Sequence, residues 1–212
     1  MTVSLVWATP EADRLVAYMA RVSAPENQGN DATAPRLIGY LIRHRHWSPF
    51  EMVSACVEIV TTRDIGRQLL RHRSFSFQEF SQRYADTREL PPAPLREARL
   101  KHPTNRQAST STTDEVLAAW WKDAQEDVLA AAETAYQIAL EYGIAKEVAR
   151  AVLPEGLTTS RLYMAGSLRS WLHFCDLRRG PETQKETRDV AEAAWTVLRE
   201  ACPAICEAWG AA

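Results

Sequence analysis

Three arginines recur at helical spacing in the stretch RDIGRQLLRHRSFSFQEFSQRYAD, which covers residues 63–86. Its first part predicts a helix over about 63–72, on which Arg63, Arg67 and Arg71 fall four residues apart and share one face. A guanidinium group donates paired hydrogen bonds to phosphate oxygens and does not lose its charge. The stretch therefore predicts a binding site for an anionic ligand.

Polar and aromatic side chains are interleaved with these arginines and narrow the kind of ligand. Gln68 and His72 share the adjacent helix face, and Glu79 lies among the cations, where its carboxylate can accept from a base or ribose or orient an arginine. A basic stripe near the end of a helix is also typical of a plain solvated surface. The mixture with Ser, Gln, Glu, His, Phe and Tyr favours a pocket for an anionic, planar molecule. The residue types alone indicate a nucleotide-like ligand.

Length and charge restrict the class of protein. The chain has 212 residues, which suits one well-buried domain. Its net charge of −2 argues against a general nucleic-acid binder. No apolar run approaches the length that crosses a bilayer, and the N-terminus lacks the pattern of a signal peptide. We expect a cytoplasmic protein that associates with neither nucleic acid nor membrane.

The cysteines and histidines show no metal-binding pattern. The four cysteines include no CxxC pair and are expected to be small buried side chains, none in a recognisable nucleophile setting. His44 and His46 are two residues apart, a spacing that suits neither a helical metal pair nor HExxH. We expect no metal ion.

The elements that position these residues are mostly helices. Strands are predicted at 3–7 and 53–61, with extended chain at 74–77. Helices are predicted to begin at Thr9-Pro10 and near Pro35, and to cover about 63–72, 113–143, a short segment with Arg150, 159–178 and 182–201. The strands are not spaced as βαβ repeats, so the predicted fold class is α+β. A Pro-rich stretch over 91–113 is expected to be an exposed loop or flap.

The segment RHRSFSFQEFSQRY resembles the signature of the flavin-dependent thymidylate synthases, the ThyX family: Arg-His-Arg, seven residues, Ser, and Arg two residues later. Every fixed position is matched here, by Arg71, His72, Arg73, Ser81 and Arg83. The segments ARVS, HWSPFE, EVARAVLP and SLRSWLHFCDLR also resemble family segments and occur in the family's order. The resemblance extends over nearly the whole chain.

This resemblance implies a fold, a reaction and an assembly. Members of the family fold as one domain, here residues 1–212, with a small, mostly antiparallel sheet packed with several long helices. They convert dUMP to dTMP with FAD, taking the carbon from 5,10-methylenetetrahydrofolate and the reducing equivalents from NADPH. They form homotetramers whose active sites combine residues of several subunits.

The resemblance also implies roles for individual residues. The positions expected to bind FAD are His46, Ser48, Arg71, His72, Arg73, Glu79, Ser167, Leu168, Arg169 and His173. The positions expected to bind dUMP are Gln68, Leu69, Leu70, Arg71, Glu79, Phe80, Ser81, Gln82, Arg83, Arg150 and Arg178. Arg178 matches the arginine proposed to favour the ionised pyrimidine, and we expect it to be the catalytic group. The chain departs from many members at Gln78 and Ser167, where they have Asn.

Other interpretations of the same residues remain open at this point. Without the resemblance, Arg178 and Arg179 are ordinary cations at a helix C-terminus, and Arg150 with Glu147 is an ordinary helical ion pair. A paralogous flavin-dependent methylase of another pyrimidine nucleotide, such as UMP, would match nearly as well. A nucleic-acid binder that uses the basic segment disagrees with the acidic overall balance.

Overall fold

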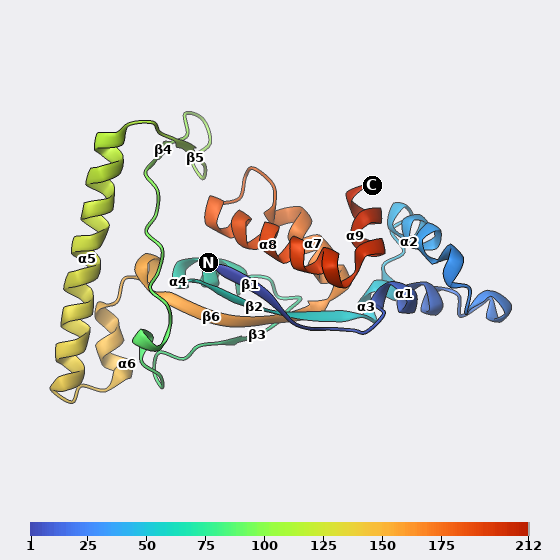
Figure 1. The fold of residues 1–212 in the computed structure, drawn as a ribbon, viewed down its shortest axis with the longest axis horizontal. Coiled ribbons are helices and arrows are strands. Elements are labelled where there is room, and N and C mark those ends of the chain that lie inside the picture. Colours follow the sequence, from blue (N-terminus) through green and yellow to red (C-terminus); the bar gives the residue numbers. More distant parts are fainter. Residues whose placement is uncertain (212) are drawn as a thin grey trace.

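A computed structural model describes residues 1–211, which form a four-stranded sheet with helices around it (Figure 1). The strands are β1 (Thr2–Ala8), β2 (Ser54–Thr62), β3 (Ser76–Glu79) and β6 (Thr159–Ser167), in the order β1-β2-β6-β3. Every pairing in this sheet is antiparallel. The predicted α+β fold, with a small antiparallel sheet and several helices, is confirmed.

The helices of residues 1–211 carry most of the remaining chain. They are α1 (Ala12–Ala20), α2 (Ala34–Arg43), α3 (Ser48–Glu51), α4 (Arg63–Leu69), α5 (Glu115–Glu141), α6 (Lys146–Ala149), α7 (Leu168–Arg178), α8 (Lys185–Ala201) and α9 (Pro203–Gly210). None of these helices is both long and apolar enough to cross a membrane.

The centre of the sheet is formed by β2 and β6, which pair along their whole lengths. Successive side chains of a strand point to opposite faces. Ile59 of β2 and Leu162 of β6 are fully buried on the face that α7 and α8 cover, whereas Tyr163 on the other face is exposed (Figure 1). The hydrophobic core therefore lies between the sheet and these two helices.

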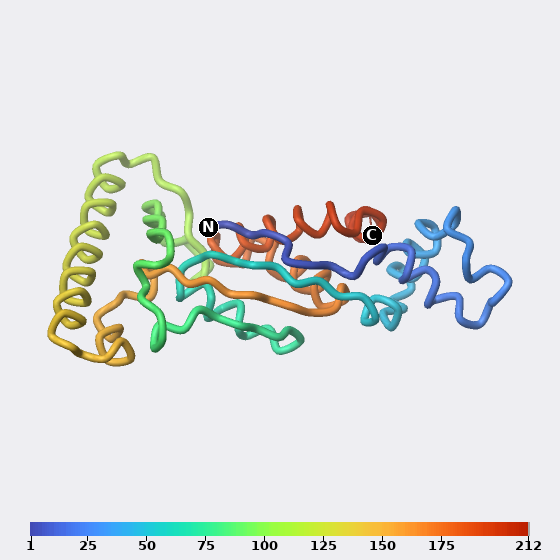
Figure 2. Tube along the Cα trace, turned by 60° about the horizontal axis from the view of Figure 1, so that its bottom comes forward, coloured from blue at the N-terminus to red at the C-terminus, as the bar shows by residue number. Residues whose placement is uncertain are grey.

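The two ends of the molecule are built differently (Figure 2). Helices α1, α2 and α9 pack together at one end of the sheet. Helix α5 stands at the other end, where only Gln125, Ala132 and Tyr136 are buried. Val116 and Trp120 of the same helix remain 81% and 62% exposed. A single chain thus leaves apolar surface of α5 uncovered.

The prediction of one helix over 159–178 is wrong for its first half. Residues 159–167 form β6, and α7 begins only at Leu168. Leu162 and Met164 are buried while Tyr163 between them is exposed, which is the period of a strand. This alternation of buried and exposed residues is short. The strand is stabilised by its pairing with β2 and β3, and the local sequence does not show that pairing.

Thr9 does not cap the first helix as expected. Helix α1 begins at Ala12 after Glu11, which has a φ of 51°. The Thr9 hydroxyl instead accepts from the N–H of Ser54 at 2.9 Å and ties β1 to β2. The Thr9 side chain therefore bonds to the sheet and does not cap the helix.

Two other helix boundaries differ, and one agrees. The helix predicted over 63–72 ends at Leu69 as α4, and α9 follows the last predicted helix without a counterpart in the sequence analysis. Asp114, rather than Thr113, caps α5 by accepting from the N–H of Leu117 at 2.9 Å. The prediction that Gly143 ends this helix is confirmed, because α5 stops at Glu141 and Gly143 has a left-handed φ of 78°.

The 91–113 segment has little regular structure, as predicted, apart from the hairpin of β4 (Arg99–Lys101) and β5 (Ser109–Ser111). It is nevertheless anchored at Arg96, a largely buried side chain. One Nη of Arg96 lies 2.9 Å from each Asp64 carboxylate oxygen and the other 2.9 Å from Glu186. The segment is therefore tied to α4 and α8 by ion pairs.

We predict that Gly166→Ala destabilises the protein by about 1–3 kcal/mol, the usual cost of overpacking a core. A Cβ atom at this position would lie 2.5 Å from Cδ1 of Phe75, whose ring is itself packed against Trp171. Urea unfolding measures the change in the free energy of unfolding. Gly29→Ala is the control, since no atom lies within 4 Å of the added methyl group. Equal unfolding midpoints for both variants would contradict the close approach.

Candidate functional site

The chain turns sharply after α4, and this turn displays the Arg-His-Arg residues. The N–H of His72 donates to the carbonyl of Leu69 at 3.0 Å, and the N–H of Phe75 donates to the carbonyl of His72 at 3.2 Å. Leu69 and Phe75 are buried on either side of the turn. Arg71 and Arg73 consequently project outward as exposed side chains, while His72 is half-buried between them.

Helix α7 presents a second set of polar side chains to the same region. The Ser167 hydroxyl accepts from the N–H of Ser170 at 3.3 Å and caps the helix. Trp171 anchors the inner face and is fully buried. Arg169 and His173 lie four residues apart on the outer face and are exposed.

The turn and the helix line one cavity of about 480 Å³. Ligand pockets in proteins commonly measure roughly 300–1,000 Å³. The rings of Trp47 and Trp209, with centroids 5.4 Å apart, add an aromatic wall. No Asp or Glu is present in the lining, which consists of Trp47, Arg71, His72, Arg73, Ser74, Arg169, Ser170, His173 and Trp209.

The charges around this cavity are unbalanced. Neither Arg71 nor Arg73 forms an ion pair with any carboxylate of residues 1–211. Arg169 pairs with Glu51 at 2.9 Å, and Glu51 also accepts from the Ser167 hydroxyl at 2.5 Å. The cavity therefore carries positive charge that an anionic ligand can neutralise.

Arg178, at the last turn of α7, contacts the turn through His72. Its Nε donates to Nε2 of His72 at 2.9 Å. Burial, followed by the neighbouring Arg178 and His173, lowers the pKa of His72 to about 4. The imidazole is therefore neutral at physiological pH and accepts the hydrogen bond.

The side-chain amide of Gln68 is held by the start of α8. Its Nε2 donates to Oε1 of Gln184 at 2.7 Å, and the buried Thr187 hydroxyl donates to its Oε1 at 2.8 Å. Gln184 in turn donates to Glu186 at 2.9 Å. The carbonyl and amino ends of the Gln68 amide are thereby fixed in direction.

Ser81, Gln82 and Arg83 lie at the other end of β3 from Arg73. The strand runs between the two groups, since Ser76 pairs with Ala165 and the later residues of β3 pair toward the start of β6. At a rise of about 3.3 Å per residue, the two groups are roughly 15–20 Å apart. The predicted site residues of one chain thus form two groups and not one.

Arg150 belongs to the second group. The Nζ of Lys146 on α6 donates to the carbonyl of Tyr84 at 3.1 Å and holds the helix against the turn that follows β3. Arg150 follows α6 directly and is half-buried. Gln82 is only 3% exposed, and its Nε2 has no hydrogen-bond partner among residues 1–211.

Glu79 and Phe80 connect this group to the sheet. The Ser160 hydroxyl donates to Oε1 of Glu79 at 2.7 Å, which fixes the carboxylate near α4. The N–H of Phe80 donates to the carbonyl of Arg161 at 2.8 Å, and its side chain is half-buried. Both residues are therefore placed by the pairing of β3 with β6.

The remaining predicted residues lie around the cavity or in the core. Leu69 and Leu168 are buried in the hydrophobic core, so only their backbones are available to a ligand, while Leu70 is exposed. Ser48 is exposed at the start of α3, next to the lining residue Trp47.

His46 precedes the lining residue Trp47 but does not itself line the cavity. Its ring packs against those of Tyr40 and His44, with centroids 6.0 and 6.2 Å away. The residue that the resemblance places at the flavin is thus an exposed histidine within an aromatic cluster of this chain. Its role at the flavin stays a prediction.

Sequence reasoning missed five contributors to the cavity and its rim: Trp47, Glu51, Ser74, Ser170 and Trp209. Trp47 and Glu51 belong to the segment HWSPFE, so the signal was present without a role for either residue. Trp209 lies on α9, a helix that was not predicted, and the packing of that helix against α2 and α8 brings it to the cavity.

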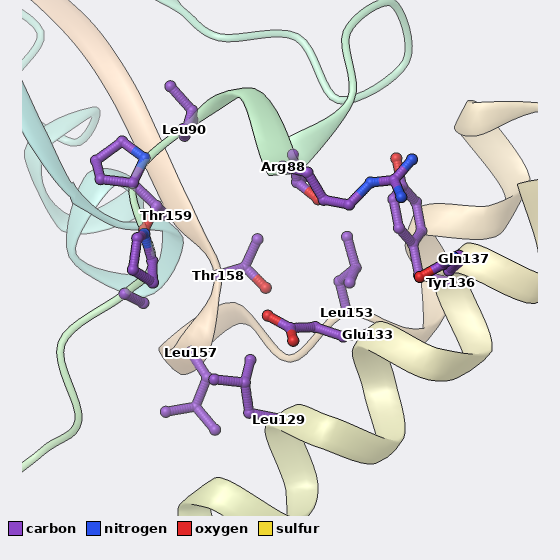
Figure 3. A pocket seen from close by; sticks show the side chains of 14 residues that line it. Arg88, Leu90, Leu129, Glu133, Tyr136, Gln137, Leu153, Leu157, Thr158 and Thr159 are labelled. Carbon is purple, nitrogen blue, oxygen red and sulfur yellow. The ribbon is translucent and has the colours of Figure 1, made fainter.

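A second cavity, of about 290 Å³, lies between α5 and the chain around residues 87–93 (Figure 3). Leu129, Leu153 and Leu157 give it an apolar wall. The guanidinium of Arg88 at its rim is already bound to Asp86, with the closest contact at 2.6 Å. Because this cavity offers no unpaired cation, it is a weaker candidate for an anionic ligand than the first.

Comparison with known proteins decides the family. The family model described as thymidylate synthase complementing protein matches residues 4–204. A probable flavin-dependent thymidylate synthase of Paramecium bursaria Chlorella virus 1 is 45% identical over 208 residues, which cover 98% of this chain and 95% of that protein. The chain belongs to the flavin-dependent thymidylate synthases.

A second relative and a solved structure agree with this assignment. The enzyme of Synechocystis sp. is 45% identical over 194 residues, covering 92% of this chain and 87% of that protein. A crystal structure of a UMP/dUMP methylase, PolB, from Streptomyces cacaoi bound with 5-Br dUMP has a TM-score of 0.85 and 32% identity, covering 99% of this chain and 94% of that one. The fold is therefore shared over essentially the whole length.

We predict that Arg73→Gln weakens FAD binding about tenfold or more, because a hydrogen bond to a charged group contributes about 1.5–3 kcal/mol. Titration of flavin fluorescence measures the dissociation constant. Arg67→Gln is the matched control, since Arg67 is exposed on α4 and paired with Glu155 outside the cavity lining. The same affinity in Arg73→Gln as in the unmodified protein would contradict a flavin in this cavity.

Proposed function

We propose that the protein catalyses the reductive methylation of dUMP to dTMP with FAD, 5,10-methylenetetrahydrofolate and NADPH. One observation carries the proposal: within residues 1–211, a cavity lined by cations from two distant segments, and by no Asp or Glu, adjoins an arginine that is held at one nitrogen only. Family membership supports the flavin as the ligand of this cavity.

The lining residues fit FAD. Arg71 and Arg73 approach the cavity from the turn, and Arg169 approaches it from α7, so a diphosphate can be bound from two sides. Trp47, Trp209 and His173 supply planar surfaces suited to ring systems. When bound, the flavin supplies hydride transfer, which no side chain of the protein can perform.

Arg178 is the group we propose for activation of the pyrimidine. Methylation at C5 of uracil requires electron density on that carbon. A guanidinium group placed at a pyrimidine carbonyl stabilises the negative charge that develops on the ring. Its Nε is engaged by His72, so its two Nη groups are available to the nucleotide.

The cysteines do not offer the alternative activation, in which a thiolate attacks C6. All four cysteines of the sequence are buried as free thiols. Burial raises the pKa of Cys202 and of Cys206 to about 12, and it also raises the pKa of Cys56 and Cys175. The thiolate is the nucleophilic form, so these side chains are unreactive at neutral pH.

The second group of residues, around Ser81, Arg83 and Arg150, is proposed to bind the nucleotide from a neighbouring chain. Its separation from the flavin cavity within one chain supports active sites shared between subunits of a homotetramer. The exposed apolar residues Val116 and Trp120 of α5 are consistent with surface that such an assembly covers.

Formation of dTMP from dUMP, with and without added FAD and NADPH, tests the proposed reaction. We expect product only when dUMP, methylenetetrahydrofolate, FAD and NADPH are all present. Product formation that is independent of flavin would contradict the proposal.

A methylase that accepts UMP is the second candidate, because the solved structures similar to this chain include PolB bound with 5-Br UMP, at a TM-score of 0.82 and 30% identity. The two nucleotides differ at the ribose 2′ position. The ratio of kcat/KM for dUMP and UMP distinguishes the candidates. We expect dUMP to be preferred, and a ratio near one would favour the second candidate.

We predict that Arg178→Ala retains FAD and lowers kcat by about 10²–10³, the usual cost of losing one preorganised donor. The absorption of bound flavin and the rate of dTMP formation are measured on the same sample. The control is Arg179→Gln, because the neighbouring Arg179 is bound to Glu192 at 2.9 Å. Full activity of Arg178→Ala would remove this residue from its proposed role.

We predict that Ser81→Ala raises KM for dUMP about tenfold, as expected for one lost hydrogen bond to a charged group, and changes kcat little. Steady-state kinetics separate the two constants. Ser76→Ala is the control, since Ser76 is an exposed serine on β3 outside the predicted set. Complete loss of turnover would instead indicate a nucleophilic serine.

A further inference from the structure

We propose that His72 is a positioning residue that holds Arg178 through a neutral acceptor, so that the full positive charge of Arg178 remains available to the pyrimidine. The inference rests on the proposed function and adds a role for His72 beyond flavin binding. It is carried by the contact between the two side chains, by the packing of the imidazole, and by the contrast with Arg179.

The contact fixes both the direction of the arginine and the tautomer of the histidine. Nε of Arg178 donates to Nε2 of His72 at 2.9 Å. An imidazole nitrogen that accepts carries no proton, so the proton of the neutral ring is on Nδ1. The bond engages Nε alone, and neither Nη group of Arg178 has a hydrogen-bond partner among residues 1–211.

The imidazole itself is held rigidly. Its ring packs edge-on against Phe174, with centroids 4.9 Å apart, and against Phe75, with centroids 6.4 Å apart. Its backbone N–H donates to Leu69 at 3.0 Å. The acceptor atom is therefore placed by the aromatic core under α7.

The surroundings keep the imidazole neutral. The titratable and charged groups near it are cations or histidines: Arg178 and His173 from α7, and Arg71 and Arg73 from its own turn. Burial, followed by Arg178 and His173, lowers the pKa of His72 to about 4. No carboxylate of residues 1–211 forms an ion pair with Arg178, so its charge is not neutralised at this contact.

The adjacent arginine shows the opposite arrangement. Nε of Arg179 donates to the carboxylate of Glu192 at 2.9 Å, and its guanidinium lies 4.8 Å from the ring centroid of Trp195. Arg179 is thus neutralised and packed, as a structural cation is. Arg178 has no ion pair among residues 1–211 and is held by a neutral ring. Two consecutive arginines of the same helix end therefore have different electrostatic settings.

Three substitutions separate position from charge. His72→Gln keeps a neutral acceptor, His72→Glu keeps an acceptor but adds a negative charge, and His72→Leu removes the acceptor. The probe is 5-fluoro-dUMP bound to the FAD-loaded protein, whose N3 ionisation is followed by fluorine NMR as the pH is changed. FAD affinity is measured on each variant in parallel, because His72 also lines the flavin cavity.

We expect the unmodified protein to raise the ionisation constant of bound 5-fluoro-dUMP above that of the free nucleotide by about tenfold or more, which is one pKa unit or more. His72→Gln should keep most of this effect, and His72→Leu and His72→Glu should lose most of it. A structural role alone would lower the amount of bound nucleotide without changing its ionisation constant.

Two results would overturn the inference. One is an unchanged ionisation constant in His72→Leu, and the other is equal behaviour of His72→Gln and His72→Glu, which remains decisive if His72→Leu fails to fold. Neither result contradicts the proposed reaction, provided that the unmodified protein forms dTMP. If the unmodified protein binds no 5-fluoro-dUMP, the proposed function and the inference both fail.

Discussion

The packing of Trp171 against the sheet is the constraint on which the site depends. The indole is fully buried, and its Nε1 donates to the carbonyl of Ala55 on β2 at 3.0 Å, so a polar group in the core is satisfied. The same ring packs against Phe75, with centroids 4.8 Å apart. One side chain thereby joins the sheet, helix α7 and the turn after α4, and it brings two segments about a hundred residues apart in the sequence to a single cavity.

The site is organised by a distribution of charge as much as by shape. Arginines that stabilise the fold, such as Arg96 and Arg179, are paired with carboxylates. Arginines that face the cavity from the turn, Arg71 and Arg73, have no carboxylate partner within residues 1–211. Unpaired cations repel one another, and a bound anion relieves that repulsion. Together with the cavity that Arg71 and Arg73 line, this lack of a carboxylate partner supports an anion-binding surface there.

Part of this arrangement is predictable from sequence. The β-branched run of β2 and the end of α5 at Gly143 follow from local rules. The strand β6 does not, because its alternation of buried and exposed residues spans only a few positions and depends on pairing with β2 and β3. The Arg-His-Arg motif locates the site, whereas Trp209 reaches it only through tertiary packing of α9. The register of β3 places the predicted site residues of one chain in two separate groups. The spacing of these residues along the sequence does not predict this separation.

The central claim is that the cations around this cavity hold a flavin. The visible absorption spectrum of the purified protein, recorded before and after addition of FAD and removal of the excess, tests it most directly. The account predicts a bound oxidised flavin that absorbs at about 450 nm. A colourless protein that retains no added FAD would contradict it.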